Sequence, residues 1–301
     1  MSTATPDLTH LTGAAQEAAI LSDEERICHI RGERWIAYAG AQRALSRLDE
    51  LMLWPKKQRM PNLLMIGPTN NGKSKIIEKF RRDQMVAGCG EFEPGVIPIV
   101  VVQVPSEPGT GRFYAMLLSG IGAPIRPRAQ VVELEQLTLR LFRTVKVKIL
   151  IIDELHNALA GSSHARRGFL NLLRFLGNEL QIPIVGVGTR EAYMAIRSDD
   201  QLENRFDPLV LPIWEEGEEL KSLIASFAGA LPLKQPSKIA TAGMSKYILA
   251  KTGGTIGEIA RLLTAAAVEA VNSGEECINE KTLKLADYQS PPERRRAFER
   301  S

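Results

Sequence analysis

The sequence predicts an α/β protein with a parallel sheet, followed by a smaller region built of helices alone. As far as Pro212, short apolar runs alternate with helical segments, and continuous apolar runs are typical of parallel strands buried on both faces. After Pro212 the strand signals disappear and helical segments remain. The chain has 301 residues, a length that suits one large core with a smaller companion.

Composition and charge exclude several classes of protein. Hydrophobic residues make up 44% and charged residues 24%, values that fit neither a disordered chain nor a membrane protein. The first ten residues lack the basic and apolar regions of a signal peptide. The three cysteines have no CxxC spacing, so neither a disulfide framework nor a cysteine zinc site is indicated. We expect a cytoplasmic protein with no membrane partner.

Residues 1–60 are predicted to form an N-terminal helical extension. Leucines recur there at helical spacing. Ser22 followed by Glu25 predicts a capping box at the start of a helix. Pro55 and Pro61 end the helical stretch.

Residues 61–212 are predicted to form the α/β core. The expected strands are residues 62–66, 96–104, 149–152, 183–187 and 209–211. The expected helices between them are residues 75–86, 113–120, 131–143 and 168–180. Residues 213–289 should form a small all-helical lid, and residues 290–301, with Pro291 and Pro292 near their start, a basic tail.

A phosphate-binding loop is the strongest motif in the chain. The segment 67–74, Gly-Pro-Thr-Asn-Asn-Gly-Lys-Ser, satisfies G-x4-G-K-[ST] and lies between an expected strand and an expected helix. Its amides can surround the phosphates of ATP, its lysine can reach the β- and γ-phosphates, and its serine can bind Mg²⁺. The alternative is a chance glycine turn. The candidate nucleotide-binding residues are Gly67, Pro68, Thr69, Asn70, Asn71, Gly72, Lys73 and Ser74.

An acidic pair follows the expected strand 149–152. Asp153 ends a buried apolar run, a costly place for a carboxylate unless it faces a cleft or a metal, so we expect it to hold Mg²⁺ together with Ser74. Glu154 is the candidate general base that polarises the attacking water. The alternative is an acidic pair that begins a surface loop. His156 is interpreted as a residue of a helix start or an interface.

Two further residues are candidates for catalysis. Thr189 follows the expected strand 183–187 and can sense the γ-phosphate or orient water; a helix-capping threonine is an equally good interpretation. Arg205 precedes the expected strand 209–211 and could enter the ATP site of a neighbouring subunit. An intrachain salt bridge is the alternative for Arg205.

These elements in this order resemble an AAA+ ATPase, and more closely the TniB and TnsC group of transposon-encoded ATPases. The resemblance extends from about residue 24 to residue 288. The stretches that resemble TniB are residues 34–38 (RWIAY), 59–62 (RMPN), 152–157 (IDELHN), 171–174 (NLLR), 178–180 (NEL) and 188–192 (GTREA).

The resemblance implies an ATP-dependent regulator of DNA transposition that uses ATP and Mg²⁺. Such proteins assemble on double-stranded DNA as homo-oligomeric rings or helical filaments. They recruit a DDE transposase of the TniA or TnsB type and a TniQ-like adaptor. ATP hydrolysis is then expected to be weak and dependent on assembly, with Arg205 matching the trans-acting arginine of the family.

The sequence departs from the family pattern at one point in the lid. Members commonly place a sensor arginine directly after the glycine that opens a lid helix, but here Gly257 is followed by Glu258. The next arginine, Arg261, lies one turn further on and could either substitute or simply face solvent.

The resemblance also indicates a DNA-binding surface. It assigns Arg112, Arg126 and Arg128 to the DNA channel, where contacts would be to phosphates rather than bases. Ordinary solvated arginines are the alternative. Two other functions stay open from the sequence: a DnaC-like or IstB-like helicase loader, and a nucleotide-binding scaffold without useful hydrolysis. The presence of Glu154 counts against the scaffold.

Overall fold

The structure is a computed structural model that describes residues 7–87, 95–105, 109–159 and 162–299. The chain forms two compact units. One unit contains the described residues up to Ala39, the loop tip Asn70–Gly72 and the residues from Ile213 onward. The other contains Gly40–Thr69 and Lys73–Pro212.

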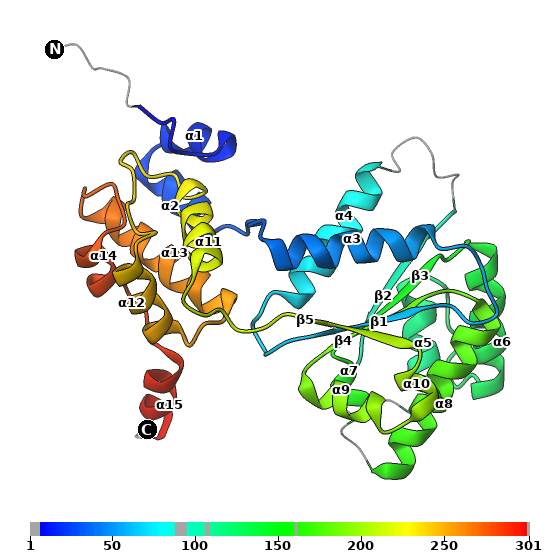
Figure 1. Ribbon diagram of the computed structural model, residues 1–301. Coiled ribbons are helices and arrows are strands. Elements are labelled where there is room, and N and C mark those ends of the chain that lie inside the picture. The colour runs from blue at the N-terminus through cyan, green and yellow to red at the C-terminus, as the bar shows by residue number, and fades with distance from the viewer. Residues whose placement is uncertain (1–6, 88–94, 106–108, 160–161, 300–301) are drawn as a thin grey trace. The chain divides into compact units, whose positions relative to one another are not determined.

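The second of these, the α/β unit, is built on a five-stranded parallel sheet (Figure 1), and the predicted fold class is confirmed. Its strands are β1 (Asn62–Ile66), β2 (Ile99–Gln103), β3 (Ile149–Asp153), β4 (Ile184–Gly188) and β5 (Phe206–Val210). Their order is β2-β3-β4-β1-β5. Because β4 lies between β1 and β3, the carboxyl ends of these three strands are neighbours.

Helices cover both faces of the sheet. On one face, Leu150 and Ile152 of β3 belong to a cluster that includes Phe113, Phe142 and Leu176 from three helices. On the other face, Gln84 donates a 2.7 Å hydrogen bond to Asp49, which joins two further helices. The helices of this unit are α3 (Ala39–Leu53), α4 (Lys73–Ala87), α5 (Thr110–Gly120), α6 (Val131–Thr144), α7 (Leu155–Leu159), α8 (Ser163–Leu180), α9 (Arg190–Arg197) and α10 (Asp200–Glu203).

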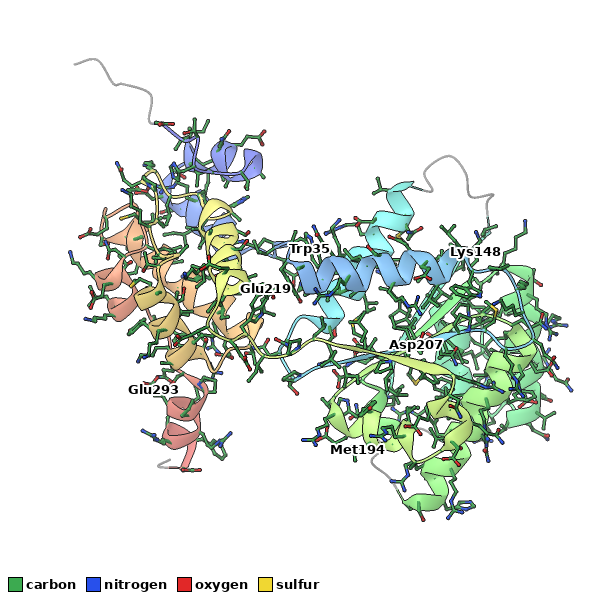
Figure 2. The ribbon with its side chains drawn as sticks, viewed as in Figure 1. Trp35, Lys148, Met194, Asp207, Glu219 and Glu293 are labelled. Carbon is green, nitrogen blue, oxygen red and sulfur yellow. The ribbon has the colours of Figure 1, made fainter. Side chains whose placement is uncertain are left out.

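The edge strand β5 carries charge on its outer side. Asp207 is exposed and its carboxylate accepts a 2.6 Å bond from Arg47 of α3 (Figure 2). Charged side chains on an edge strand discourage pairing with another sheet.

The helical unit is organised around one long helix, α13, whose residues Ile259, Leu262 and Leu263 are fully buried. Its helices are α1 (Gly13–Ala19), α2 (Asp23–Arg31), α11 (Glu218–Gly229), α12 (Ala242–Thr252), α13 (Ile256–Asn272), α14 (Glu280–Leu285) and α15 (Pro291–Glu299). The predicted capping box is present at the start of α2, where Ser22 and Glu25 each accept the other's backbone N–H.

The segment predicted as a basic tail contains a helix. Pro291 is the first residue of α15, and Glu293 accepts a 2.7 Å bond from the backbone N–H of Ser290. Proline suits the first turn of a helix, where its missing N–H has no intrahelical partner. Two prolines in sequence therefore mark a helix start here rather than the end of structure.

Among the described residues, no helix has the length and apolar character needed to cross a membrane.

A fully buried arginine ties α2 to the rest of the helical unit. Arg26 is 0% exposed and donates to the carbonyl oxygen of Pro232 at 3.1 and 3.2 Å. It also donates to Glu276 at 2.8 Å and to Asp23 at 2.9 Å. Burial acts to raise the pKa of Glu276, but hydrogen bonds from Arg26 and from the Lys234 backbone N–H outweigh it, so the pKa is lowered.

Replacement of Arg26 should destabilise the helical unit strongly. Arg26→Met leaves the partly buried carboxylate of Glu276 without its main partner and should lower the free energy of unfolding by about 3–5 kcal/mol at pH 7. In the parental chain the lowered pKa of Glu276 gives stability that is lost as pH falls through that pKa. In the variant Glu276 protonates at higher pH, so the difference in the free energy of unfolding between the two proteins should become smaller on acidification.

Urea unfolding at pH 7 and at pH 4 measures both effects. Arg31→Met, on the exposed end of the same helix, is the matched control. An equal loss in the free energy of unfolding for Arg26→Met and Arg31→Met would contradict this account of Arg26.

Candidate active site

The loop 67–74 connects β1 to α4 through two residues of left-handed backbone. Gly72 has φ +82° and Asn70 has φ +61°, a conformation that glycine adopts freely and that asparagine tolerates better than most residues. Gly67 donates its N–H to the carbonyl oxygen of Gly188 at 3.2 Å, which fixes the start of the loop against the end of β4.

Lys73 is held inside the loop. Its side chain is nearly buried, and Nζ donates to the carbonyl oxygens of Gly67 at 2.8 Å and Pro68 at 2.7 Å. Burial lowers the pKa of Lys73, and the nearby carboxylates of Glu154 and Asp153 act in the opposite direction. The ammonium group therefore lies within the loop that the sequence predicts to bind phosphates.

Ser74 and Asp153 meet at the ends of two different strands of the sheet. Ser74 lies in the first turn of α4 and donates from Oγ to Asp153 Oδ2 at 2.7 Å, and Asp153 is the last residue of β3. Two oxygens this close can be adjacent ligands of one Mg²⁺ ion, whose ligands lie about 2.1 Å away. Hard oxygen donors also match the preference of that ion, so the residues present fit Mg²⁺.

The structure describes no group of three acidic, histidine or cysteine side chains able to hold a metal within the residues it covers. Mg²⁺ at a nucleotide site needs no such group, because one or two protein ligands act together with the phosphates.

Glu154 is fixed by its neighbours on both sides. Its backbone has φ +55°, an unusual value for a residue with a long side chain, and its N–H donates to Asp153 Oδ1 at 2.8 Å. Its Oε2 lies 3.1 Å from Nε2 of His156. The other ring nitrogen of His156, Nδ1, is buried and has no hydrogen-bond partner among the described residues, so Nε2 is the ring nitrogen placed to donate to Glu154.

Sequence reasoning missed this role of His156. The sequence places His156 at a helix start or an interface, and the histidine lies in the first turn of α7. The spacing Asp-Glu-x-His was the available signal, because the turn that follows β3 returns the side chain to Glu154.

Thr189 lies at the end of β4, beside the ends of β1 and β3. It occupies the N-cap position of α9, yet its hydroxyl accepts no hydrogen bond from a helix N–H and instead donates to Glu191. This bond lowers the pKa of Glu191.

Arg205 lies at the opposite end of the sheet from Lys73. Its carbonyl oxygen accepts the N–H of Asn62, the first residue of β1, whereas the loop follows the last residue of β1. A strand of this length separates the two ends by roughly 16 Å.

The guanidinium of Arg205 has a neutral partner, because NH1 donates to Asn178 Oδ1 at 2.9 Å. Within the described ranges, no carboxylate lies at ion-pair distance from it. Partial burial and the nearby Arg59 and Arg174 lower the pKa of Arg205. It lines a pocket of about 500 Å³ together with Lys57 and Arg59, and Asp200 and Asp207 are the acidic residues of its lining.

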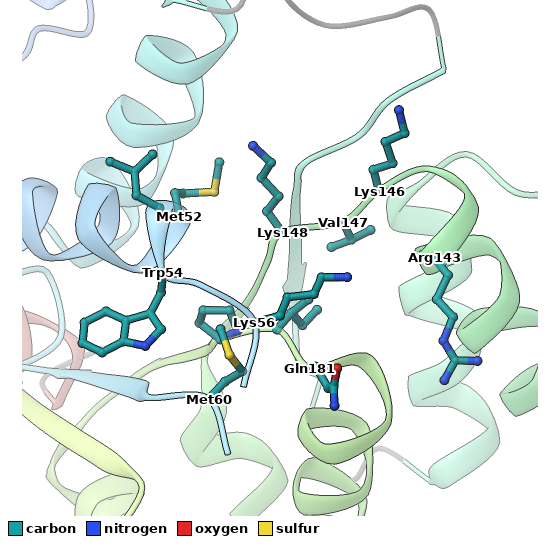
Figure 3. Close-up of a pocket in the computed structure, with 12 residues that line it drawn as sticks. Met52, Trp54, Lys56, Met60, Arg143, Lys146, Val147, Lys148 and Gln181 are labelled. Carbon is teal, nitrogen blue, oxygen red and sulfur yellow. The ribbon is translucent and has the colours of Figure 1, made fainter. Parts of the chain in front are cut away.

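A second pocket, of about 480 Å³, is strongly basic (Figure 3). It shares Trp54 and Met60 with the Arg205 pocket. Its cationic residues are Lys56, Arg143, Lys146 and Lys148.

The predicted DNA-binding arginines are all exposed. Arg112 lies in the first turn of α5, and Arg126 and Arg128 lie in the connection between α5 and α6. A methyl group added at Gly111 would lie 3.2 Å from Val131, so this connection ends beside the start of α5. The start of α5, which carries Arg112, therefore lies beside the end of the connection that carries Arg126 and Arg128.

The lid residues at the start of α13 differ in exposure. Glu258 is buried and Arg261 is exposed. Asn70 and Asn71, at the tip of the phosphate-binding loop, contact the first residues of α13.

The fold and this site define the class of the protein. A P-loop follows β1, an acidic pair lies at the end of β3, and β4 lies between these two strands. This arrangement is the core of an AAA+ ATPase. The model of the bacterial TniB protein matches residues 26–216, and the chain belongs to this family. None of the curated proteins matches it in sequence.

Solved structures support the fold. The chain is similar to the ORC2 protein of Aeropyrum pernix in its ADPNP and ADP complexes, with a TM-score of 0.60 and 15% identity over 85% of this chain and 70% of that one. The ORC1 protein of the same organism in complex with DNA has a TM-score of 0.56 and 14% identity over 86% and 68%. Cdc6p of Pyrobaculum aerophilum has a TM-score of 0.57 and 13% identity over 88% and 71%.

A glycine at the end of β4 is required by the packing of Ala192. A methyl group added at Gly188 would lie 2.9 Å from Ala192 Cβ and 3.6 Å from His156 Nδ1. Gly188→Ala should therefore lower the free energy of unfolding by about 1–3 kcal/mol. Thermal unfolding measures it.

Gly177→Ala is the matched control. A methyl group there would lie 3.5 Å from Ile184, an ordinary contact, and the position is helical, so this variant should gain about 0.5–1 kcal/mol. The account of Gly188 is wrong if both variants change stability in the same direction.

Proposed function

We propose that this chain is an ATP-dependent regulator of DNA transposition. It binds ATP with Mg²⁺, assembles as a homo-oligomeric ring or filament on double-stranded DNA, and recruits a DDE transposase of the TniA or TnsB type with a TniQ-like adaptor. The observation that carries the proposal is the meeting of Ser74 and Asp153 within a member of the TniB family. The relatives of known structure add support, since their complexes contain nucleotides or DNA.

Each residue at the nucleotide has a separate task. Lys73 and the loop amides bind the phosphates, and Ser74 and Asp153 hold Mg²⁺, which neutralises charge on the phosphates. Glu154 accepts the proton of the attacking water, and the hydrogen bond from His156 orients its carboxylate. Thr189, at the neighbouring strand end, orients the water or contacts the γ-phosphate.

The position of Arg205 supports an active site shared between subunits. The arginine lies a strand length from its own phosphate-binding loop, so it completes the site of a second copy. There it stabilises the charge that develops on the transferred phosphoryl group, a contribution of about 10³ or more in rate in enzymes that use such an arginine.

A mixture of two inactive variants tests the shared site. Lys73→Ala should lose ATP binding, and Arg205→Ala should bind ATP but not hydrolyse it efficiently. When they are mixed with duplex DNA, part of the activity should return, because a Lys73→Ala subunit supplies Arg205 to the ATP of its neighbour. Steady-state phosphate release measures the recovery.

The matched control combines Lys73→Ala with Glu154→Gln. Both changes damage the same side of the interface, so no intact site can form and no activity should return. If the first mixture stays inactive although the two variants co-assemble, the trans role of Arg205 is refuted.

Removal of charge at the α5 surface tests the DNA contact. The variant with Arg112, Arg126 and Arg128 changed to alanine should bind duplex DNA more weakly than the parent does. The loss of affinity should be similar for duplexes of unrelated sequence. The slope of log affinity against log salt should fall by about 0.9 for each lost phosphate contact. Fluorescence anisotropy over a salt series measures both.

A variant with Arg43, Arg81 and Arg82 changed to alanine removes the same charge from exposed positions of α3 and α4. It should retain most of the affinity and the parental slope. An equal loss of DNA affinity in the two triple variants would place the DNA contact elsewhere.

A further inference from the structure

The tip of the phosphate-binding loop caps a lid helix. Thr255, the N-cap residue of α13, makes no side-chain capping bond. Instead, the N–H of Ile256 donates to Asn71 Oδ1 at 3.3 Å, and the N–H of Gly257 donates to the carbonyl oxygen of Asn70 at 3.0 Å. The first turn of a helix leaves N–H groups without intrahelical partners. Here two loop residues satisfy them.

The approach of the loop to α13 requires glycine at residue 257. A methyl group added there would lie 1.9 Å from Asn70 Oδ1, far inside contact distance. The side chain of Asn70 thus occupies the space that any larger residue at position 257 would fill.

Glu258, the next residue of α13, holds the side chain of Asn70. It is 7% exposed, and its Oε1 accepts from Asn70 Nδ2 at 3.2 Å. Since Asn70 has left-handed backbone, this bond and the one to Gly257 fix a loop residue in a conformation that few residues adopt unaided.

The charge of Glu258 is balanced from α15. Arg294 donates to Oε1 at 2.8 Å and to Oε2 at 3.2 Å, and the Tyr288 hydroxyl donates to Oε2 at 2.9 Å. Burial acts to raise the pKa of Glu258, but the bonds from Arg294 and Tyr288 prevail and lower it. Arg261 adds a more distant positive charge, is exposed, and makes no described hydrogen bond.

We propose that Arg294 is a positioning residue for the phosphate-binding loop. By forming a two-point ion pair with Glu258, it keeps the carboxylate where it binds Asn70, and so keeps the loop tip in its phosphate-binding conformation. Without Arg294, an uncompensated buried carboxylate is more stable if it turns to water, and the tip loses its side-chain partner. The inference rests on the proposed nucleotide site.

Nucleotide affinity tests this role without DNA or assembly. The probe is a fluorescent, non-hydrolysable ATP analogue with Mg²⁺, titrated into full-length protein at a concentration where it is monomeric. Arg294→Gln should weaken binding roughly five- to tenfold, within the usual range of coupling between two sites. Arg295→Gln, on the same helix with an exposed side chain, is the matched control and should bind as the parent does.

A second substitution separates positioning from folding. Glu258→Gln added to Arg294→Gln removes the uncompensated charge but keeps an oxygen acceptor for Asn70, so affinity should return to within about twofold of the parent. Thermal unfolding of each variant checks the fold, and Arg294→Lys replaces Arg294→Gln if the latter does not fold. Arg294→Lys keeps the charge but not the two-point geometry, and should also bind more weakly.

Parental affinity in the Arg294 variant overturns the inference, as does an equal loss in Arg295→Gln or a failure of Glu258→Gln to restore binding. These results differ from a failure of the proposed nucleotide site, in which the parental chain itself would not bind the analogue.

Discussion

The hydrogen bond between Ser74 and Asp153 depends on the order of the strands. Its two ends follow β1 and β3, which are not neighbours, and β4 separates them. A methyl group at Gly186 of β4 would lie 2.6 Å from Leu155 and 3.0 Å from Leu64, so the residues after β3 and those of β1 pack directly over this glycine. Glycine at residue 186 thus allows side chains from both neighbouring segments to pack over β4.

Positive charge is divided between the two ends of the sheet. Lys73 lies at the carboxyl ends of the strands, while Arg205, with Arg59 and Arg174 near it, lies at the amino ends. If Lys73 and Arg205 act as we propose, one chain carries cations for both sides of a bound nucleotide but cannot apply them to the same molecule. In that proposal, the separation is the physical reason for activity that depends on assembly.

Local motifs were predictable from the sequence, and contacts between distant residues were not. The loop 67–74 and the pair Asp153-Glu154 could be recognised because their chemistry depends on adjacent residues and on the strand before them. The bond from Asn70 to Glu258 joins residues 188 apart, and the pair of Arg294 with Glu258 joins residues 36 apart. A single sequence carries no signal for such pairs. The helix α15 was missed for a different reason: the segment that begins with two prolines was predicted as a tail, although these prolines occupy a helix start.

The account requires that Ser74 and Asp153 hold Mg²⁺ on a bound nucleotide. The most direct measurement is the affinity for an ATP analogue with and without Mg²⁺, in the parental chain and in Asp153→Asn. The account predicts that Mg²⁺ tightens binding to the parent and has little effect on the variant, which should bind the metal-free analogue at least as well because a negative charge near the phosphates has been removed. An equal effect of Mg²⁺ on both proteins would contradict it.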